Sequence, residues 1–294
     1  MPHHELAKKV ASLNPFKSLP PAEQILDESI GRLGNLEVRL ARGKKEIRSA
    51  QRLRYEVFYR EGGARPSPKM AFTRRDVDRF DKFCDHLIVI DHAWKTARGK
   101  TKPKIVGVYR LLRGDMAERA GSFYSEGEYD LAPLLERHSG ARILELGRSC
   151  VLASHRSKRV IELLWRGLLA YIRAYRIDVM IGCASFHGTN PRVHAEALSY
   201  LAHYARVESK WNVRAHADKH VPMEMMTKEK LEPKKALDAL SPLIKGYLRL
   251  GARVGDGAVV DIKFNTTDVF VIMPIKEIGS RYIDYFTAMD RRAA

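Results

Sequence analysis

The sequence predicts a mixed α/β protein, an α/β (α+β) fold with a central sheet flanked by helices. Three observations predict it: short apolar segments of strand length, long segments with apolar residues at helical spacing, and a strand–helix–strand–helix order in mid-chain. Of the 294 residues, 45% are apolar and 30% are charged, which is enough apolar material for a large buried core. The chain has neither an internal repeat nor a clear linker, so we predict one domain with a C-terminal elaboration.

The N-terminal part is predicted to hold one strand and one helix after a polar start. Residues 1–35 mix charge with proline and glycine, so we expect a flexible N-terminal arm followed by a main domain over 36–294. Residues 36–40 alternate apolar with charged side chains, which predicts a half-buried strand. Apolar residues at helical spacing then predict a helix from about Lys44 to Tyr59, ended by Gly62 and Gly63.

The middle of the chain predicts a hairpin and then alternating strands and helices. Strands at 86–91 and 105–112 flank a connector rich in lysine and glycine and are expected to pair antiparallel. A strand, a long amphipathic helix, a strand and a helix with Asn190 as N-cap follow, over 142–152, 160–175, 178–185 and 190–204. This order predicts a βαβ-like crossover.

The C-terminal part, from about residue 207, is predicted to extend the same domain. It contains a basic connector at 228–235 and a short helix that starts at Ser241 and Pro242 and stops at Gly251. Two strands near 258–264 and 269–273 follow, joined through residues 265–268.

Charge and composition limit the partners. The chain has 52 Lys and Arg against 35 Asp and Glu, a formal charge of +17, which favours a polyanionic partner such as an acidic carrier protein, anionic lipid or nucleic acid. The apolar segments are too short to span a membrane and the start lacks the apolar region of a secretory signal, so we expect a cytoplasmic protein. Three widely spaced cysteines predict reduced, buried thiols, and we expect no metal site.

Charged residues lie beside apolar structure in four segments of the first half. Arg54 and Phe58 share one face of the first helix, and Asp78 and Asp81 precede a strand. Arg110 lies in the second strand of the hairpin. Such charges are also typical of solvated or paired surface groups, and both interpretations stay open at this point.

A further strand contains Glu145 and Arg148, which would point to opposite faces unless Gly147 marks a bulge that brings them together. A partly buried carboxylate there is suited to take a proton from an attacking ammonium. A structural ion pair between the two residues is the equally weighted alternative.

The order of these segments resembles the acyl-homoserine-lactone synthases of the GNAT-like acyltransferase superfamily. Their signature runs Arg-x-x-Val-Phe, Asp-x-x-Asp, an Arg-Leu strand and Glu-x-x-Arg. This chain supplies it, in the same order, with Arg54, Val57, Phe58, Asp78, Asp81, Arg110, Glu145 and Arg148.

A closer resemblance, over most of residues 36–286, is to the ornithine N-acyltransferases of bacterial ornithine-lipid synthesis. The segments that carry it are 51–58, 83–87, 147–151, 182–189, 242–249, 256–258 and 264–269. The resemblance implies a GNAT-like fold, a 3-hydroxyacyl group on acyl carrier protein as donor, and the α-amino group of ornithine as acceptor. The product would be lyso-ornithine lipid. No cofactor is implied beyond the phosphopantetheine thioester of the acyl carrier protein, which is a co-substrate.

The resemblance and the residue types together suggest roles for the candidate site. We expect Glu145 to be the catalytic base. The residues expected to bind the acceptor are Arg54, Phe58, Asp78, Asp81, Arg110 and Arg148. Those expected to bind the donor are Ser149, Val151, His155, Arg156, Lys158 and Arg159. The acyl chain is expected in a cleft lined by the 160–175 helix and the 178–185 strand.

The donor assignment rests on the segment 153–159. Coenzyme A users of the superfamily hold the pyrophosphate on a glycine-rich loop at this place. This segment has no glycine and is rich in arginine and lysine, which suits an acidic carrier protein. An ordinary solvated loop is the alternative.

Other functions compete with this one. An acyl-homoserine-lactone synthase using S-adenosylmethionine, or an N-acyltransferase for another amino acid, is the nearest alternative. A non-catalytic nucleic-acid or membrane-surface binding protein is the alternative of another class. The basic residues are scattered without interleaved aromatics, so we expect no nucleic-acid partner. Peripheral contact with anionic lipid at the inner face of the cytoplasmic membrane is compatible with the enzyme.

Overall fold

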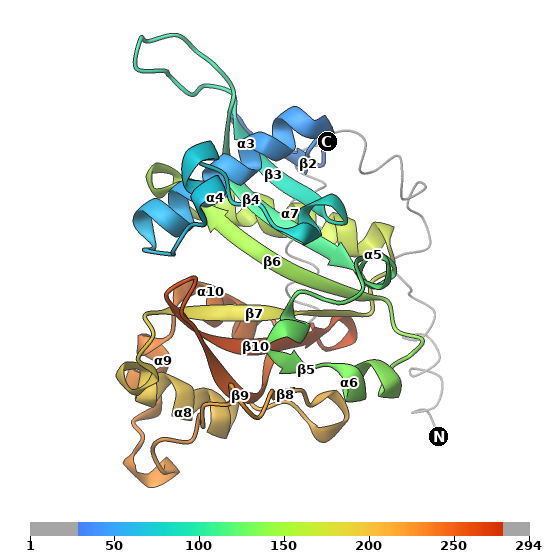
Figure 1. Ribbon diagram of the computed structural model, residues 1–294, viewed down its shortest axis with the longest axis vertical. Helices are drawn as coiled ribbons and strands as arrows, with labels where there is room; N and C mark the ends of the chain where they lie inside the picture. Colours follow the sequence, from blue (N-terminus) through green and yellow to red (C-terminus); the bar gives the residue numbers. More distant parts are fainter. Residues whose placement is uncertain (1–28, 279–294) are drawn as a thin grey trace, which may run out of the picture.

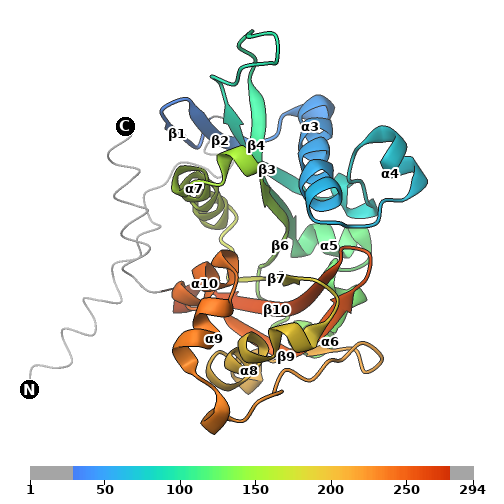
Figure 2. The ribbon, with the colours of Figure 1, turned by 90° about the vertical axis from the view of Figure 1, so that its left-hand side faces the viewer.

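The computed structural model describes residues 29–278, which form a ten-stranded sheet with helices on both faces (Figures 1 and 2). The strand order is β1-β2-β3-β4-β6-β7-β10-β9-β8-β5. The strands are β1 (Gly31–Leu33), β2 (Leu36–Leu40), β3 (Asp85–Asp91), β4 (Lys104–Arg113), β5 (Tyr129–Asp130), β6 (Ile143–Val151), β7 (Val179–His187), β8 (Arg214–Ala215), β9 (Arg253–Asp261) and β10 (Thr266–Pro274). The helices are α3 (Gly43–Tyr55), α4 (Pro68–Thr73), α5 (Gly114–Ala120), α6 (Ala132–Arg137), α7 (Lys158–Ala174), α8 (Ala195–Tyr204), α9 (Pro233–Ala239) and α10 (Pro242–Arg249).

Two helical layers cover the sheet, and the mixed α/β prediction is confirmed. Figure 2 shows α3 and α7 on opposite sides of the β2–β3–β4 region. Val160, Leu164 and Leu168 of α7 recur at helical spacing, are buried, and join the largest apolar core together with residues of α8 and α10. Ala50 and Leu53 of α3 pack on the other face, against Ile88, Val108 and Cys150.

The predicted N-terminal boundary differs from the observed one. Regular structure begins at β1, five residues before Leu36, because Gly31–Leu33 pairs antiparallel with Leu36–Val38 through a tight turn. The rest of the predicted arm, residues 1–28, lies outside the described part of the chain. The predicted antiparallel hairpin is confirmed as β3 and β4.

The C-terminal extension belongs to the main sheet, since β10 pairs antiparallel with β7 along its whole length. The predicted turn at 265–268 is wrong. The chain turns at 262–265, where Asn265 has a left-handed backbone with φ 56°, and Thr266–Asp268 already belong to β10. The end of the basic connector also begins a helix, α9, at Pro233. The short helices were missed because six or seven residues do not establish a helical repeat.

Strands β6 and β7 form the predicted parallel βαβ crossover, but they pair over only Ile143–Glu145 and Val179–Ile181. Beyond this point they diverge, as Figure 1 shows. Gly182 lies where they separate. A Cβ atom there would stand 2.4 Å from the carbonyl oxygen of Leu146, so only glycine lets the two backbones approach this closely. Within residues 29–278 no helix is both long and apolar enough to cross a membrane.

Candidate active site

A cavity of about 430 Å³ opens where β6 and β7 diverge. Its lining comes from both faces of the sheet. Tyr109 and Tyr247, whose hydroxyl groups are 2.6 Å apart, belong to the face covered by α7 and α10. Arg110, Glu145 and Asp268 line the same cavity. Their positions in β4, β6 and β10 place their side chains on the face of the sheet opposite to α7 and α10. Residues of both faces of the sheet therefore meet at the point of divergence.

A π-helical turn, Glu56–Glu61, follows α3 and forms one side of the cavity. Val57, Phe58 and Glu61 all line it, and the Phe58 ring meets Phe264 edge-on at 5.9 Å. Wide turns of this kind are rare and often occur at functional sites, because the extra residue re-aims the side chains that follow. Phe58, which we expected to bind the acceptor, thus lies in the cavity wall.

A bulge in β6 forms the opposite side. The pairing of β4 with β6 shifts between Val108 and Arg110, so that Arg148 and Ser149 together oppose Tyr109. Arg148 has φ 52°, a left-handed conformation uncommon for a residue with a side chain. The expected bulge is present, centred on Arg148 and not on Gly147. Both bulge residues line the cavity, together with Glu145.

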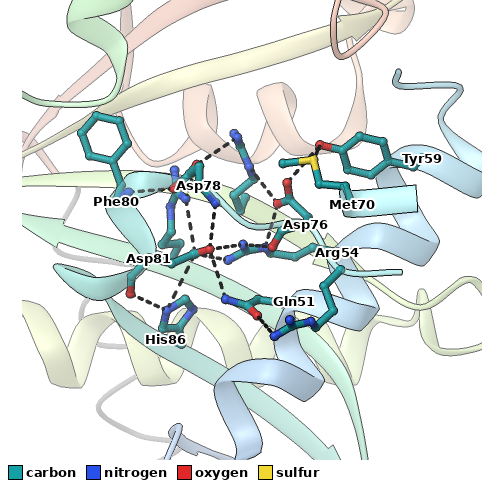
Figure 3. Close-up of polar contacts among 12 residues, drawn as sticks. Gln51, Arg54, Tyr59, Met70, Asp76, Asp78, Phe80, Asp81 and His86 are labelled. Atoms are coloured by element: carbon teal, nitrogen blue, oxygen red, sulfur yellow. Dashed lines mark hydrogen bonds and ion pairs between the residues drawn. The ribbon is translucent and has the colours of Figure 1, made fainter. Parts of the chain in front are cut away.

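Behind this wall, three arginines and three aspartates form a buried network (Figure 3). Arg54 is fully buried and binds Asp76 and Asp81, with Nη1 2.8 Å from Asp81 Oδ1. Asp78 Oδ2 accepts from Arg110 at 2.6 Å and from Arg148 at 3.2 Å. Burial alone would raise the carboxyl pKa values, but the arginines hold the pKa of Asp81 at about 2 and that of Asp76 below its usual value.

The charges of this network balance, because three guanidinium groups face three carboxylates. Arg54 and Asp81 do not line the cavity, so they are placed to position other groups and not to touch the acceptor. Arg148 lies in the wall between the Tyr124 and Phe264 rings. It uses Nε and Nη2 for Asp76, Asp78 and Tyr124 and leaves Nη1 without a hydrogen bond to any described residue.

Glu145 is 4% exposed, lies at the last position where β6 pairs with β7, and lines the cavity. Burial raises the pKa of Glu145, although backbone N–H groups of Tyr124 and Ser125 donate to it at 2.7 and 2.8 Å. Those two bonds use two of about four acceptor positions of a carboxylate. A direct ion pair with Arg148, the alternative from sequence, is not present, because Arg148 binds Asp76 and Asp78 instead.

A second acidic group was missed from sequence. Glu128, Asp261 and Asp268 place one carboxylate oxygen each within 4.8 Å of the others. Burial and the neighbouring Glu128 raise the pKa of Asp268 to about 7, and burial raises the pKa of Glu128. The three residues come from separate segments without a common spacing, and Asp268 was assigned to a turn, so no sequence pattern singled them out. Asp76, Tyr124 and Phe264 were missed for the same reason.

Of the residues expected to bind the donor, Ser149 and Arg156 line the cavity. Val151, His155, Lys158 and Arg159 do not. His155 binds Asp91 at 3.0 Å, while Lys158 and Arg159 lie exposed in the first turn of α7. No residue of α7 is among those lining the cavity, because its apolar face fills the core. The observed cavity therefore does not run along that helix, as the cleft for the acyl chain was expected to do, although four residues of β7 line it: Cys183, Ala184, Ser185 and His187.

The cysteines are not activated as nucleophiles. Burial raises the pKa of Cys84 and of Cys150 to about 12, and it raises the pKa of Cys183 as well. Cys183 lines the cavity, but its thiol lies 3.5 Å from Glu128, whose negative charge further disfavours a thiolate.

The sequence matches known proteins along most of its length. Residues 53–166 match the acetyltransferase (GNAT) domain family. The chain is 51% identical to the L-ornithine N(alpha)-acyltransferase of Rhizobium meliloti (strain 1021), over 91% of this chain and 88% of that one. It is also 51% identical to the L-ornithine N(alpha)-acyltransferase of Brucella abortus (strain 2308), over 90% and 92% of the two chains.

Among solved structures, an N-acyl amino acid synthase from uncultured soil microbes superposes with a TM-score of 0.45 and 11% identity, covering 82% of this chain and 92% of that one. The assignment rests on the sequence relatives, which make a non-catalytic binding protein wrong as an alternative. The chain has the GNAT-like fold, is an acyltransferase, and belongs to the L-ornithine N(alpha)-acyltransferase family.

Proposed function

We propose that this enzyme transfers a 3-hydroxyacyl group from acyl carrier protein to the α-amino group of ornithine, giving lyso-ornithine lipid. The names of its relatives support the acceptor. The observation that supports the chemistry is the placement of Glu145, a buried carboxylate that lines the cavity where β6 and β7 diverge.

In the proposed reaction the α-ammonium of the acceptor gives a proton to Glu145, directly or through a water molecule. The free amine attacks the thioester carbonyl, the new C–N bond forms, and the C–S bond breaks as the carrier thiolate leaves and takes up a proton. A carboxylate with a raised pKa is a better base for an ammonium than an ordinary one. Nη1 of Arg148 is placed to hold the acceptor carboxylate.

The donor is proposed to dock on the segment between β6 and α7. Arg156 lines the cavity and pairs with Glu61, and Lys158 and Arg159 stand exposed beside it. This cationic surface fits an acidic carrier domain whose pantetheine arm reaches the bulge of β6. The net charge of +17 also supports peripheral association of the enzyme with the inner, anionic face of the cytoplasmic membrane. The proposed product is a lipid, which fits this location.

Two other acceptors define the runner-up functions: S-adenosylmethionine, as in an acyl-homoserine-lactone synthase, and another amino acid. The test is to incubate the purified chain with 3-hydroxyacyl carrier protein and each acceptor separately, following free carrier thiol and identifying products by mass spectrometry. Thiol release with N-acyl-ornithine supports the proposal. Thiol release only with another acceptor would show that this other acceptor is the substrate. The absence of turnover with every acceptor would contradict the proposed function.

The base is tested by Glu145→Gln with Glu126→Gln as the matched control. Glu126 also binds a backbone N–H of the same loop, that of Phe123 at 2.6 Å, but does not line the cavity. We expect Glu145→Gln to lower kcat by roughly a hundredfold or more and the control to stay within about threefold of wild type. Equal losses would assign Glu145 to loop anchoring alone.

A further inference from the structure

Glu128, Asp261 and Asp268 meet at the edge of the catalytic cavity. Asp261 and Asp268 line that cavity, while Glu128 lines an adjoining cavity of about 420 Å³ that Asp261 also borders. Asp268 lies on β10, Asp261 ends β9, and Glu128 precedes β5. The fold therefore brings together three carboxylates from separate segments.

No cation of the described residues is paired with this group. Lys219 and Arg148 are positive charges that act on Glu128, but Lys219 donates to the carbonyl of Gly127, and Arg148 is bound to Asp76 and Asp78. Asp268 is 7% exposed, and its Oδ1 has no hydrogen-bond partner in residues 29–278. A buried carboxylate oxygen without a partner is costly, which points to a ligand that supplies the missing donor.

The neighbouring arginine–aspartate network makes the contrast clear. There, every carboxylate has at least one guanidinium partner, and the charges balance. The acidic group of the cavity has the same number of carboxylates and no counter-charge. We propose that this group binds the side-chain ammonium of the acceptor and so selects a diamino acid, an inference that rests on the proposed function.

The dimensions fit an ammonium ion. The three carboxylate oxygens lie within 4.8 Å of one another, so the centre of the triangle they form is roughly 2.8 Å or less from each oxygen. That distance is typical of a charge-assisted N–H···O hydrogen bond. An ammonium has three donors, one for each carboxylate. The raised pKa values of Asp268 and Glu128 agree, because a bound cation would offset both the desolvation cost of burial and the repulsion from the neighbouring carboxylates.

The acidic group also lies at a suitable separation from Glu145. Glu145 pairs with Ile181, and strand alternation puts Cys183 and Ser185 on the same face of β7 as Ile181. Cys183 contacts Glu128, and Ser185 pairs with Asp268. Along β7, Cys183 lies two residues, about 7 Å, and Ser185 four residues, about 13 Å, beyond Ile181. An extended ornithine has roughly 6 Å between its two nitrogens, and a hydrogen bond of about 3 Å at each end brings its reach into that range. The α-nitrogen can thus reach Glu145 while the δ-nitrogen occupies the acidic group.

The experiment compares ornithine with norvaline, which has the same carbon chain without the δ-amine. Wild type, Asp268→Asn and the control Asp256→Asn are assayed with a fixed acyl carrier donor, and kcat and KM are measured for each acceptor. Asp256 lies on β9, pairs with Arg206, and is not among the residues that line the cavity. Thermal melts establish whether each variant is folded. If Asp268→Asn does not fold, Asp261→Asn takes its place in the experiment.

We expect wild type to prefer ornithine by at least roughly a hundredfold in kcat/KM, because norvaline leaves the buried carboxylates unpaired. Asp268→Asn should lower kcat/KM for ornithine by roughly thirtyfold or more, mainly through KM, and change norvaline by less than about threefold. Asp256→Asn should keep the wild-type ratio.

Other outcomes would overturn the inference in distinguishable ways. Equal kcat/KM for ornithine and norvaline in wild type, or an equal loss of kcat/KM for both in Asp268→Asn, would contradict the ammonium site. Neither result would contradict the proposed acyl transfer. Turnover of neither acceptor contradicts the proposed function and the inference with it. Loss of ornithine turnover on chelation, restored by Mg²⁺ or Ca²⁺, would show a metal ion at these carboxylates and contradict the ammonium.

Discussion

The buried carboxyl groups of Asp81 and Asp268 have pKa values displaced in opposite directions. Asp81 has Arg54 Nη1 at 2.8 Å, and despite burial its pKa falls to about 2. Asp268 lacks a cation, and burial beside Glu128 raises its pKa to about 7. Ionisation of Asp81 therefore stabilises the folded protein, whereas ionisation of Asp268 destabilises it.

Asp268→Asn should make the ligand-free protein more stable at pH 8. The folded-state pKa of Asp268 lies above its unfolded value, so its contribution to wild-type stability is present below about pH 4 and is lost as the pH rises to about 7. The variant avoids that loss. The rise of the Asp268 pKa from 3.8 to about 7 sets an upper bound of about 4 kcal/mol, so we expect a gain of about 2–4 kcal/mol in the free energy of unfolding at pH 8, or roughly 5–10 °C in Tm, and little difference near pH 4. Thermal melts across pH test this, and an unchanged Tm at pH 8 would contradict the unpaired charge.

Arg54→Met should destabilise the fold strongly, because it leaves Asp76 and Asp81 without their shared buried partner. The expected loss is about 3–5 kcal/mol in the free energy of unfolding. Arg60→Met is the matched control, since Arg60 forms an exposed pair with Glu56 and should change stability by less than about 0.5 kcal/mol. Denaturant titration measures both. Similar small effects would show that the network is not needed for folding.

Gly182→Ala should reduce activity and stability together. Its methyl group would meet the Leu146 carbonyl at 2.4 Å, and its φ of 152° is unfavourable for alanine. Strands β6 and β7 would have to separate nearer to Glu145, which changes the cavity. Gly140→Ala, where a methyl group meets no atom within 4 Å, should be close to neutral. Wild-type kcat in Gly182→Ala would contradict the role of the close approach in shaping the site.

Charge reversal in the first turn of α7 should weaken use of the carrier protein alone. Lys158→Glu combined with Arg159→Glu should raise KM for the acyl carrier donor by roughly tenfold at low salt, with KM for the amino acid unchanged. Lys230→Glu, an exposed charge elsewhere, is the control. Steady-state kinetics at two ionic strengths test the point. Unchanged donor KM in the double variant would place carrier docking on another surface.

Much of the fold was predictable because its long elements have clear periods. The alternation of 36–40 and the helical spacing in 160–175 gave β2 and α7, and the order of elements gave the crossover between β6 and β7. Short elements such as α5 and β8 have too few residues to show a period. Their position depends on packing against distant segments.

The candidate site was only partly predictable. Motifs along the chain singled out Glu145 and Arg148, which line the cavity, but they also suggested acceptor binding by Arg54, which lies fully buried behind the wall. Spacing cannot distinguish a residue that faces the cavity from one that supports it. Asp268 was missed because its proximity to Glu128 is created by pairing of strands far apart in sequence.

The most direct test of the account is to identify which nitrogen of ornithine is acylated. Purified enzyme would be given 3-hydroxyacyl carrier protein and ornithine labelled with ¹⁵N at the δ-position, and the product fragmented by mass spectrometry. The account predicts one free carrier thiol per N-acyl-ornithine, with the acyl group on the unlabelled α-nitrogen, because the δ-nitrogen is held by Glu128, Asp261 and Asp268. An acyl group on the labelled δ-nitrogen, or no acylated ornithine at all, would contradict it.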